Sequence, residues 1–207
     1  FSLPGLELVS AKYQPYIDTV EFNILLEDNG AFNYVYGAKE VSTFNYQTMV
    51  ARYPKGMLDV NVPWEFYNTN GWVPDYHQAS PISDASFGSV IRLGNNNYAA
   101  VFLAPLSDKM EAYYATSPLG PWTNRTILYQ IPGEDHLTYF GVAHKETAVN
   151  GIYTISYSNN YTIGRMLDDK GMYMPNYQKV NLLALSPYTS GSAEQTLFAF
   201  TAEKQER

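Results

Sequence analysis

Hydrophobic and polar residues alternate with a period of two along most of the chain, and helical spacing is nearly absent. Such alternation is typical of half-buried β-strands, whose successive side chains point to opposite faces of a sheet. Runs rich in Asn, Gly, Pro and Asp separate the alternating segments and predict turns. The pattern predicts an all-β protein with short strands at 31–37, 47–53, 87–93, 97–104, 110–116, 126–130 and 151–157.

Three consecutive stretches of the chain repeat one plan. In the first two, an acidic residue precedes a strand led by Phe, and further strands and a Trp follow, at Trp64 and Trp122. The third stretch, from about Tyr139, is looser. Repeated four-stranded units predict β-propeller blades, with a two-sheet sandwich as the alternative. The approximate blades are 17–75, 82–132 and 138–182, with 183–207 as a C-terminal strand or tail.

Composition limits the function classes. The chain of 207 residues is 45% hydrophobic and 16% charged, which suits one folded body with a sizeable core rather than a disordered chain. Acidic residues outnumber basic ones, 20 to 13, and no Lys or Arg cluster offsets them, which disfavours nucleic acid as a partner. The chain has no apolar run long enough to span a bilayer. It contains 19 Tyr, an aromatic content typical of ligand-facing β-proteins.

Motifs for other chemistries are absent from the sequence. There is no cysteine, which excludes disulfides, thiolate metal sites and cysteine nucleophiles. There is no serine nucleophile elbow, phosphate loop or dinucleotide fingerprint, and the three histidines lack metal-ligand spacing. The sequence therefore predicts neither a metal site nor a cofactor.

Several short motifs together resemble a known family. They include Tyr34–Gly37, Ala143–Glu146 and, most specifically, the Ser-Pro-Leu-Gly-Pro-Trp segment at 117–122. The chain resembles the C-terminal portion of five-bladed β-propellers related to furanosidases and arabinanases, over most of residues 1–180. The resemblance implies a secreted, glycoside hydrolase-like protein that acts on furanose- or pentose-containing polysaccharide at the propeller axis.

The resemblance also implies that the chain holds about three to three and a half of five blades. Missing N-terminal blades or a companion chain would supply the others. Two further hypotheses stay open: a carbohydrate-binding propeller without catalysis, and an interaction subunit whose exposed sheet edges pair with a companion chain.

Asp18 and Asp84 are the candidate catalytic residues. They head corresponding strands in the first two repeats. Glycoside hydrolysis needs two carboxyl groups, and strand starts beside the axis would direct both into the funnel. The alternative is structural, because acids at such positions also close turns by accepting backbone N–H bonds. Glu111, in a third strand, is expected to face solvent.

His144, Glu146, Tyr157 and Trp72 are the candidate substrate-binding residues. The first two belong to an Ala-His-x-Glu motif of the resembling family, in which Lys145 stands where relatives usually have Pro. The rings of Tyr157 and Trp72 could stack on the C–H face of a sugar, with burial in the core as the alternative for Tyr157.

Asn124 and Asn160 begin Asn-x-Thr sequons and are candidate glycosylation sites in a secreted protein. For Asn160 there is a second interpretation, because the resemblance places it in a polar cluster near the funnel. A glycan-bearing residue would instead lie on an exposed loop.

Overall fold

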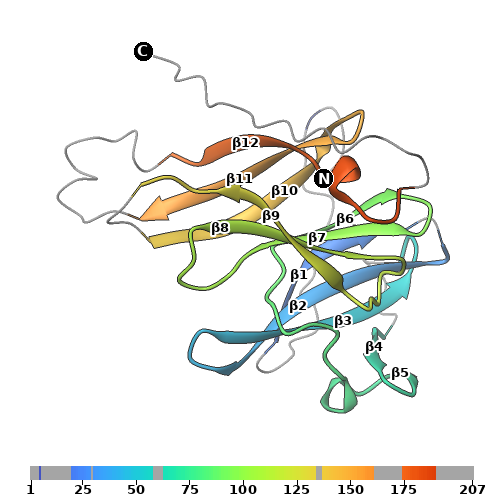
Figure 1. Cartoon of the computed structure of the whole chain (residues 1–207). Coiled ribbons are helices and arrows are strands. Elements are labelled where there is room, and N and C mark those ends of the chain that lie inside the picture. Colours follow the sequence, from blue (N-terminus) through green and yellow to red (C-terminus); the bar gives the residue numbers. More distant parts are fainter. Residues whose placement is uncertain are drawn as a thin grey trace.

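Three antiparallel β-sheets follow one another along the chain (Figure 1). The computed structural model describes residues 5, 20–28, 30–57, 63–133, 137–160 and 174–189. Nearly all of the regular structure in these ranges is strand, which confirms the predicted all-β class. No helix among these residues is long and apolar enough to cross a membrane.

Each sheet is made of strands that are consecutive in sequence. The first sheet contains β1 (Val20–Glu27), β2 (Phe32–Ser42), β3 (Asn45–Pro54), β4 (Glu65–Asn68) and β5 (Gly71–Val73), followed by the 3-10 helix η1 (Tyr76–Gln78). The second contains β6 (Ser89–Gly94), β7 (Asn97–Leu103), β8 (Lys109–Ala115) and β9 (Thr123–Gln130). The third contains β10 (Leu137–Val149), β11 (Ile152–Asn160) and β12 (Asn176–Asn181).

The connections follow from local turn chemistry. Between β10 and β11, Asn150 and Gly151 have φ of 52° and 81°, the left-handed conformation that a two-residue hairpin favours and that these residue types tolerate. After β12 the chain forms a single helical turn, α2 (Leu182–Leu185), where the sequence predicts a strand or tail. The rest of that prediction, from residue 190 onward, lies outside the described residues.

The second sheet lies between the other two and buries both of its faces (Figure 1). Strand β7 therefore has six consecutive buried residues rather than an alternating pattern. The face toward the first sheet packs in a cluster that includes Tyr36, Val50, Phe87, Tyr98, Phe102 and Trp122. The opposite face packs against the third sheet in a cluster that includes Ile91, Val101, Met110, Tyr114, Tyr153 and Ile155.

The backbone just before β6 lies directly against that of β10. A Cβ atom added at Gly88 would lie 1.8 Å from the carbonyl oxygen of Gly141, so only glycine fits there. Next to this contact, the backbone N–H of Ala143 donates to Ser89 Oγ at 2.9 Å. The absence of a side chain at Gly88 therefore allows the second and third sheets to approach this closely.

The first strands of all three sheets gather in one region. β6 contacts both β1 and β10, and Lys145 Nζ of β10 lies 3.2 Å from Glu27 Oε2 of β1. Both side chains of this ion pair are about half exposed, so its contribution to stability is small. The ion pair nevertheless shows that β1 of the first sheet and β10 of the third sheet lie close together.

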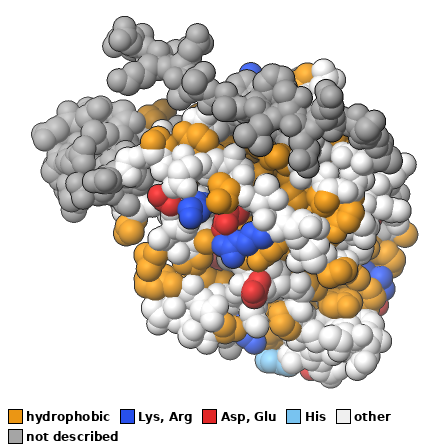
Figure 2. Space-filling model, viewed as in Figure 1, with side chains coloured by type: hydrophobic (Ala, Val, Ile, Leu, Met, Phe, Trp, Pro, Cys, Tyr) orange, Lys and Arg blue, Asp and Glu red, His pale blue; other side chains and the backbone are white. Residues whose placement is uncertain are grey.

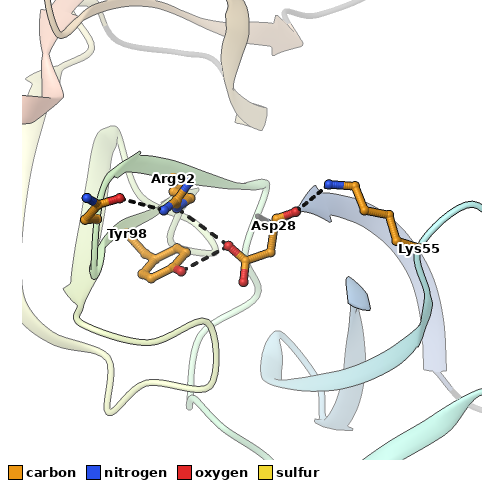
Figure 3. A network of polar contacts seen from close by, with 5 residues as sticks. Asp28, Lys55, Arg92 and Tyr98 are labelled. Atoms are coloured by element: carbon orange, nitrogen blue, oxygen red, sulfur yellow. Dashed lines mark hydrogen bonds and ion pairs between the residues drawn. The ribbon is translucent and has the colours of Figure 1, made fainter. Parts of the chain in front are cut away.

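A polar network joins the first and second sheets (Figure 3). The Tyr98 hydroxyl donates to Asp28 Oδ1 at 3.2 Å, and Arg92 Nε lies 3.6 Å from the same oxygen. Lys55 Nζ donates to the backbone carbonyl of Asp28 at 2.9 Å. Burial, together with the nearby Asp28 charge, raises the pKa of the Tyr98 phenol. The network fixes the end of β1 against β6 and β7.

On the face shown in Figure 2, acidic and basic side chains lie close together near the middle, with patches of hydrophobic side chains around them. Several large apolar side chains of the protein are exposed, among them Phe44 (56%) and Phe140 (76%). Scattered exposed apolar residues are normal on protein surfaces. Exposure alone therefore does not assign a role to such a residue, and its place relative to a pocket and its backbone conformation must also be considered.

Gly88→Ala tests the close contact between the second and third sheets. We expect a loss of about 3 kcal/mol or more in the free energy of unfolding, because the added methyl group meets backbone that cannot rotate away. Urea unfolding followed by tyrosine and tryptophan fluorescence measures it. Gly94→Ala is the matched control, because a Cβ there meets nothing within 4 Å. Equal stability of the two variants would contradict the contact.

Tyr114→Phe tests the buried phenol of the second sheet. Among the described residues no group pairs with the Tyr114 hydroxyl, and burial raises the pKa of this phenol. In the unfolded chain this phenol ionises near pH 10, whereas in the folded protein it stays neutral to higher pH. The wild type therefore keeps its stability below pH 10 and loses stability above it. At neutral pH we expect the free energy of unfolding of Tyr114→Phe to equal that of the wild type or to exceed it by about 1 kcal/mol. Above pH 10 the stability of the variant should fall less than that of the wild type.

Thermal unfolding from pH 7 to 11 measures this effect. Tyr177→Phe serves as the control, since that ring is 59% exposed and should not alter the profile. A Tyr114→Phe variant that loses stability at neutral pH would indicate that the hydroxyl has a partner.

Candidate functional site

A pocket of about 190 Å³ opens between the first and second sheets. Its walls come from the β2–β3 turn, from residues 84–86 before β6, and from β7, β8 and β9. No residue of β1, β6 or β10 lines it, so it lies apart from the region where the first strands gather. The volume is below the range of about 300–1,000 Å³ typical of drug-sized ligands, which suits a single small ring.

Thr48 of β3 holds the segment that carries Asp84 to the pocket. Thr48 is fully buried, its N–H donates to the Ser83 carbonyl at 3.0 Å, and its carbonyl accepts from the Ile82 N–H at 2.9 Å. Its hydroxyl donates to the Ala85 carbonyl and accepts from the Phe87 N–H. Four hydrogen bonds at one residue therefore attach the start of the second sheet to the middle of the first.

A charged pair on the second sheet lies at the pocket, and Arg125 is the member of the pair that lines it. Arg125 of β9 donates to both carboxylate oxygens of Glu111 of β8, at 3.0 and 2.5 Å. The Glu111 side chain is 8% exposed and that of Arg125 is 51% exposed. The hydrogen bonds to Glu111 are the main cause that raises the pKa of the Arg125 guanidinium. Arg125 therefore lines the pocket with a half-exposed side chain, while its partner Glu111 is buried behind it.

Two aromatic rings lie beside the charged pair. Phe102 and Tyr113 are stacked with ring centroids 5.2 Å apart, and the Arg125 guanidinium carbon lies 5.6 Å from the Phe102 centroid. Both rings line the pocket. Flat apolar surface next to a fixed hydrogen-bond donor can hold a ring that has an apolar face and polar edges.

Asp84, one of the two predicted catalytic residues, lines this pocket and is exposed. It has no ion-pair partner in the part of the chain that the structure describes. It lies five positions before β6 begins at Ser89, so it precedes the strand that it was expected to head. Asp18, the second predicted catalytic residue, lies outside the described residues.

His144 and Glu146 lie on β10 and do not line the pocket. The Nε2 atom of His144 is 2.8 Å from Ser156 Oγ, and its ring centroid is 6.3 Å from that of Tyr177 on β12. Glu146 is exposed. These two predicted binding residues therefore belong to the third sheet and do not meet Asp84 at this pocket.

The two predicted stacking rings already have neighbours. Tyr157 is 4% exposed and packs in the core between the second and third sheets, which favours the structural interpretation of this residue. The Arg52 guanidinium carbon lies 4.1 Å from the Trp72 ring and 4.0 Å from Phe32, and Arg52 also pairs with Glu65 at 2.8 Å. One face of Trp72 is thus covered by a cation.

Both sequon asparagines are exposed. Asn124 lies on β9 with a φ of 55°, and its side-chain nitrogen donates to Thr123 Oγ1 at 3.0 Å and to the Tyr188 hydroxyl at 3.2 Å. Asn160 ends β11, and the other residues of its sequon lie outside the described residues. A glycan at Asn124 would compete with the hydrogen bonds of its nitrogen.

The Ser-Pro-Leu-Gly-Pro-Trp segment has a structural role. The Tyr36 hydroxyl of the first sheet donates to the Pro118 carbonyl at 2.9 Å. The Trp122 ring packs edge-on against Phe87 with centroids 5.2 Å apart. The motif therefore docks the second sheet on the first, on the same side as the Thr48 contacts.

Sequence reasoning missed Arg125, Phe44 and the true position of Glu111. Glu111 was expected to face solvent, but it is buried. The reason is tertiary: β8 lies in a sheet covered on both faces, and its register with β9 shifts between Met110 and Glu111. The only signal for this pair in the sequence was that a basic residue, Arg125, lies in the strand that follows the one containing Glu111.

Among the described residues no group of three potential ligands could hold a metal.

Comparison with known proteins gives a family and a fold. The profile of a family described as "Domain of unknown function (DUF5005)" matches residues 1–181. No curated protein matches the chain. One similar crystal structure is that of a "putative hydrolase" from Bacteroides ovatus, with a TM-score of 0.62 and 18% identity. The match covers 78% of this chain and 45% of that one, so this chain spans less than half of that protein. At this identity the similarity shows a shared fold.

Thr48→Val tests the contacts that position Asp84. The isosteric change removes the hydroxyl and leaves the partly buried Ala85 carbonyl and the buried Phe87 N–H without it, so we expect a loss of about 1–3 kcal/mol in the free energy of unfolding. Thr48→Ser keeps the hydroxyl and removes a methyl group, with an expected loss of about 1 kcal/mol. Chemical denaturation measures both. A larger loss in the serine variant would mean that packing, and not hydrogen bonding, matters at Thr48.

Proposed function

This chain belongs to the DUF5005 family, and we propose from its own geometry that it binds a saccharide in the pocket between the first and second sheets. The observation that carries the proposal is that one pocket is lined by an exposed Asp84 carboxylate, by stacked aromatic rings and by the half-exposed Arg125. A sugar ring has an apolar C–H face and a rim of hydroxyl groups. The pocket offers an apolar wall for the first and both an acceptor and a donor for the second.

We further propose that the three sheets are blades of a β-propeller. The sheets follow one another in sequence, each pairs its strands in chain order, and their first strands gather in one region. This arrangement is the one expected of neighbouring blades around an axis. Because the chain spans 45% of the similar structure, the other blades would come from a longer chain or a companion chain.

Hydrolysis of the bound saccharide is a second candidate function. The similarity in fold to the protein described as a "putative hydrolase" supports it. Glycoside hydrolysis needs two carboxyl groups, one protonated and one ionised. Asp84 is the carboxylate that lines the described pocket, and the neighbouring Glu111 is held by Arg125, so the second carboxyl group would have to come from outside the described residues, for example from Asp18. On the family resemblance, we propose furanose- or pentose-containing polysaccharide as the substrate. The same resemblance leads us to propose that the protein is secreted and glycosylated at Asn124 and Asn160.

Asp84→Ala tests the binding site. We expect affinity for a linear arabinan oligosaccharide to fall about tenfold or more, because a hydrogen bond from a sugar hydroxyl to a charged acceptor is lost. Isothermal titration calorimetry measures the affinity, and release of reducing ends measures turnover. Asp108→Ala is the matched control, since Asp108 is exposed and does not line the pocket.

The outcomes separate the two functions. Binding without turnover in the wild type supports a carbohydrate-binding protein, whereas turnover that Asp84→Asn abolishes while binding persists supports a hydrolase. Absence of binding to arabinan, xylan and other neutral oligosaccharides would refute the proposed function.

A further inference from the structure

We propose that Phe44, at the tip of the β2–β3 hairpin, is a ligand-contacting residue that stacks on the apolar face of a neutral sugar ring in this pocket. The inference rests on the proposed function and names a residue that the sequence analysis did not single out. Three independent observations support it: the backbone conformation of Phe44, its exposure at the pocket, and the charge balance around it.

The backbone at Phe44 is in a conformation that phenylalanine disfavours. Phe44 has a φ of 59°, in the left-handed region, where a Cβ atom crowds the backbone. Of the six described non-glycine residues with positive φ, three are asparagines, the residue type that tolerates this region best. Strain of this kind gathers at functional sites, and of the three bulky residues that adopt it, Phe44, Leu106 and Phe140, only Phe44 lines the pocket.

The Phe44 side chain contributes little to the core. It is 56% exposed, and among the described residues its ring has no aromatic partner. It lines the pocket together with Asp84 and Arg125. By contrast, Phe102 of the same pocket is 2% exposed and stacks on Tyr113, so its ring is already engaged. Phe44 is therefore an aromatic ring with free surface at the pocket mouth.

Charge selects the kind of sugar. Glu111 already matches the positive charge of Arg125 through two hydrogen bonds, while Asp84 has no ion-pair partner among the described residues. Counted over the described residues, the site therefore carries an excess of one negative charge. A uronic acid would be repelled by it, whereas a neutral sugar can donate hydroxyl protons to Asp84 and present its C–H face to Phe44.

Phe44→Gly is the decisive variant, because glycine relieves the strained φ while it removes the ring. We expect its melting temperature to equal or exceed that of the wild type, and its affinity for a linear arabinan oligosaccharide to fall about tenfold. Phe140→Gly is the matched control: Phe140 also has a positive φ, of 56°, is 76% exposed and does not line the pocket. Phe44→Trp should retain binding.

Calorimetric titrations with the arabinan oligosaccharide and with an acidic oligogalacturonide distinguish the possibilities. Weaker binding in Phe44→Gly alone, with the neutral sugar preferred, supports the inference. Unchanged affinity in Phe44→Gly, an equal loss in Phe140→Gly, a melting temperature lowered by several degrees in Phe44→Gly, or preference for the acidic sugar would each overturn it. A wild type that binds neither sugar would instead refute the proposed function itself.

Discussion

Thr48 is the residue on which the arrangement of the first two sheets most depends. Its backbone and hydroxyl groups together make four hydrogen bonds to residues 82–87, although it belongs to a strand in the middle of the first sheet. Because Thr48 is fully buried, water cannot replace these partners. The segment between the sheets is therefore fixed where it would otherwise be a free linker. Asp84 lies within it, so the same contacts that join the sheets place the carboxylate at the pocket.

Docking of the second sheet uses apolar packing on both faces and a few specific polar contacts. The Gly88–Gly141 contact sets the spacing to the third sheet, and the Asp28–Arg92–Tyr98 network fixes the first sheet at the opposite face. These contacts are short-range and directional, so they select one alignment among the many that apolar faces alone would allow.

The pocket depends on this alignment for its chemistry. Arg125 and Glu111 come from neighbouring strands of the second sheet, whereas Phe44 comes from a hairpin of the first. Neutralisation of Arg125 by Glu111 leaves Asp84 as the unpaired charge among the described residues that line the pocket. The motif at 117–122, which carried the family resemblance most specifically, serves docking through Tyr36 and Phe87 and lies outside the lining of the pocket. Resemblance in that motif thus indicates fold more directly than function.

The sequence by itself determined the all-β class, the approximate positions of seven of the twelve described strands and turns such as Asn150–Gly151, because alternation and turn chemistry act between residues close in the chain. It also singled out Asp84. Only the tertiary structure decided that Tyr157 is core, that a cation covers Trp72, and that Glu111 is buried beside Arg125. Those outcomes depend on which sheet faces meet and on register shifts between strands, and contacts between distant residues leave no periodic trace in the sequence.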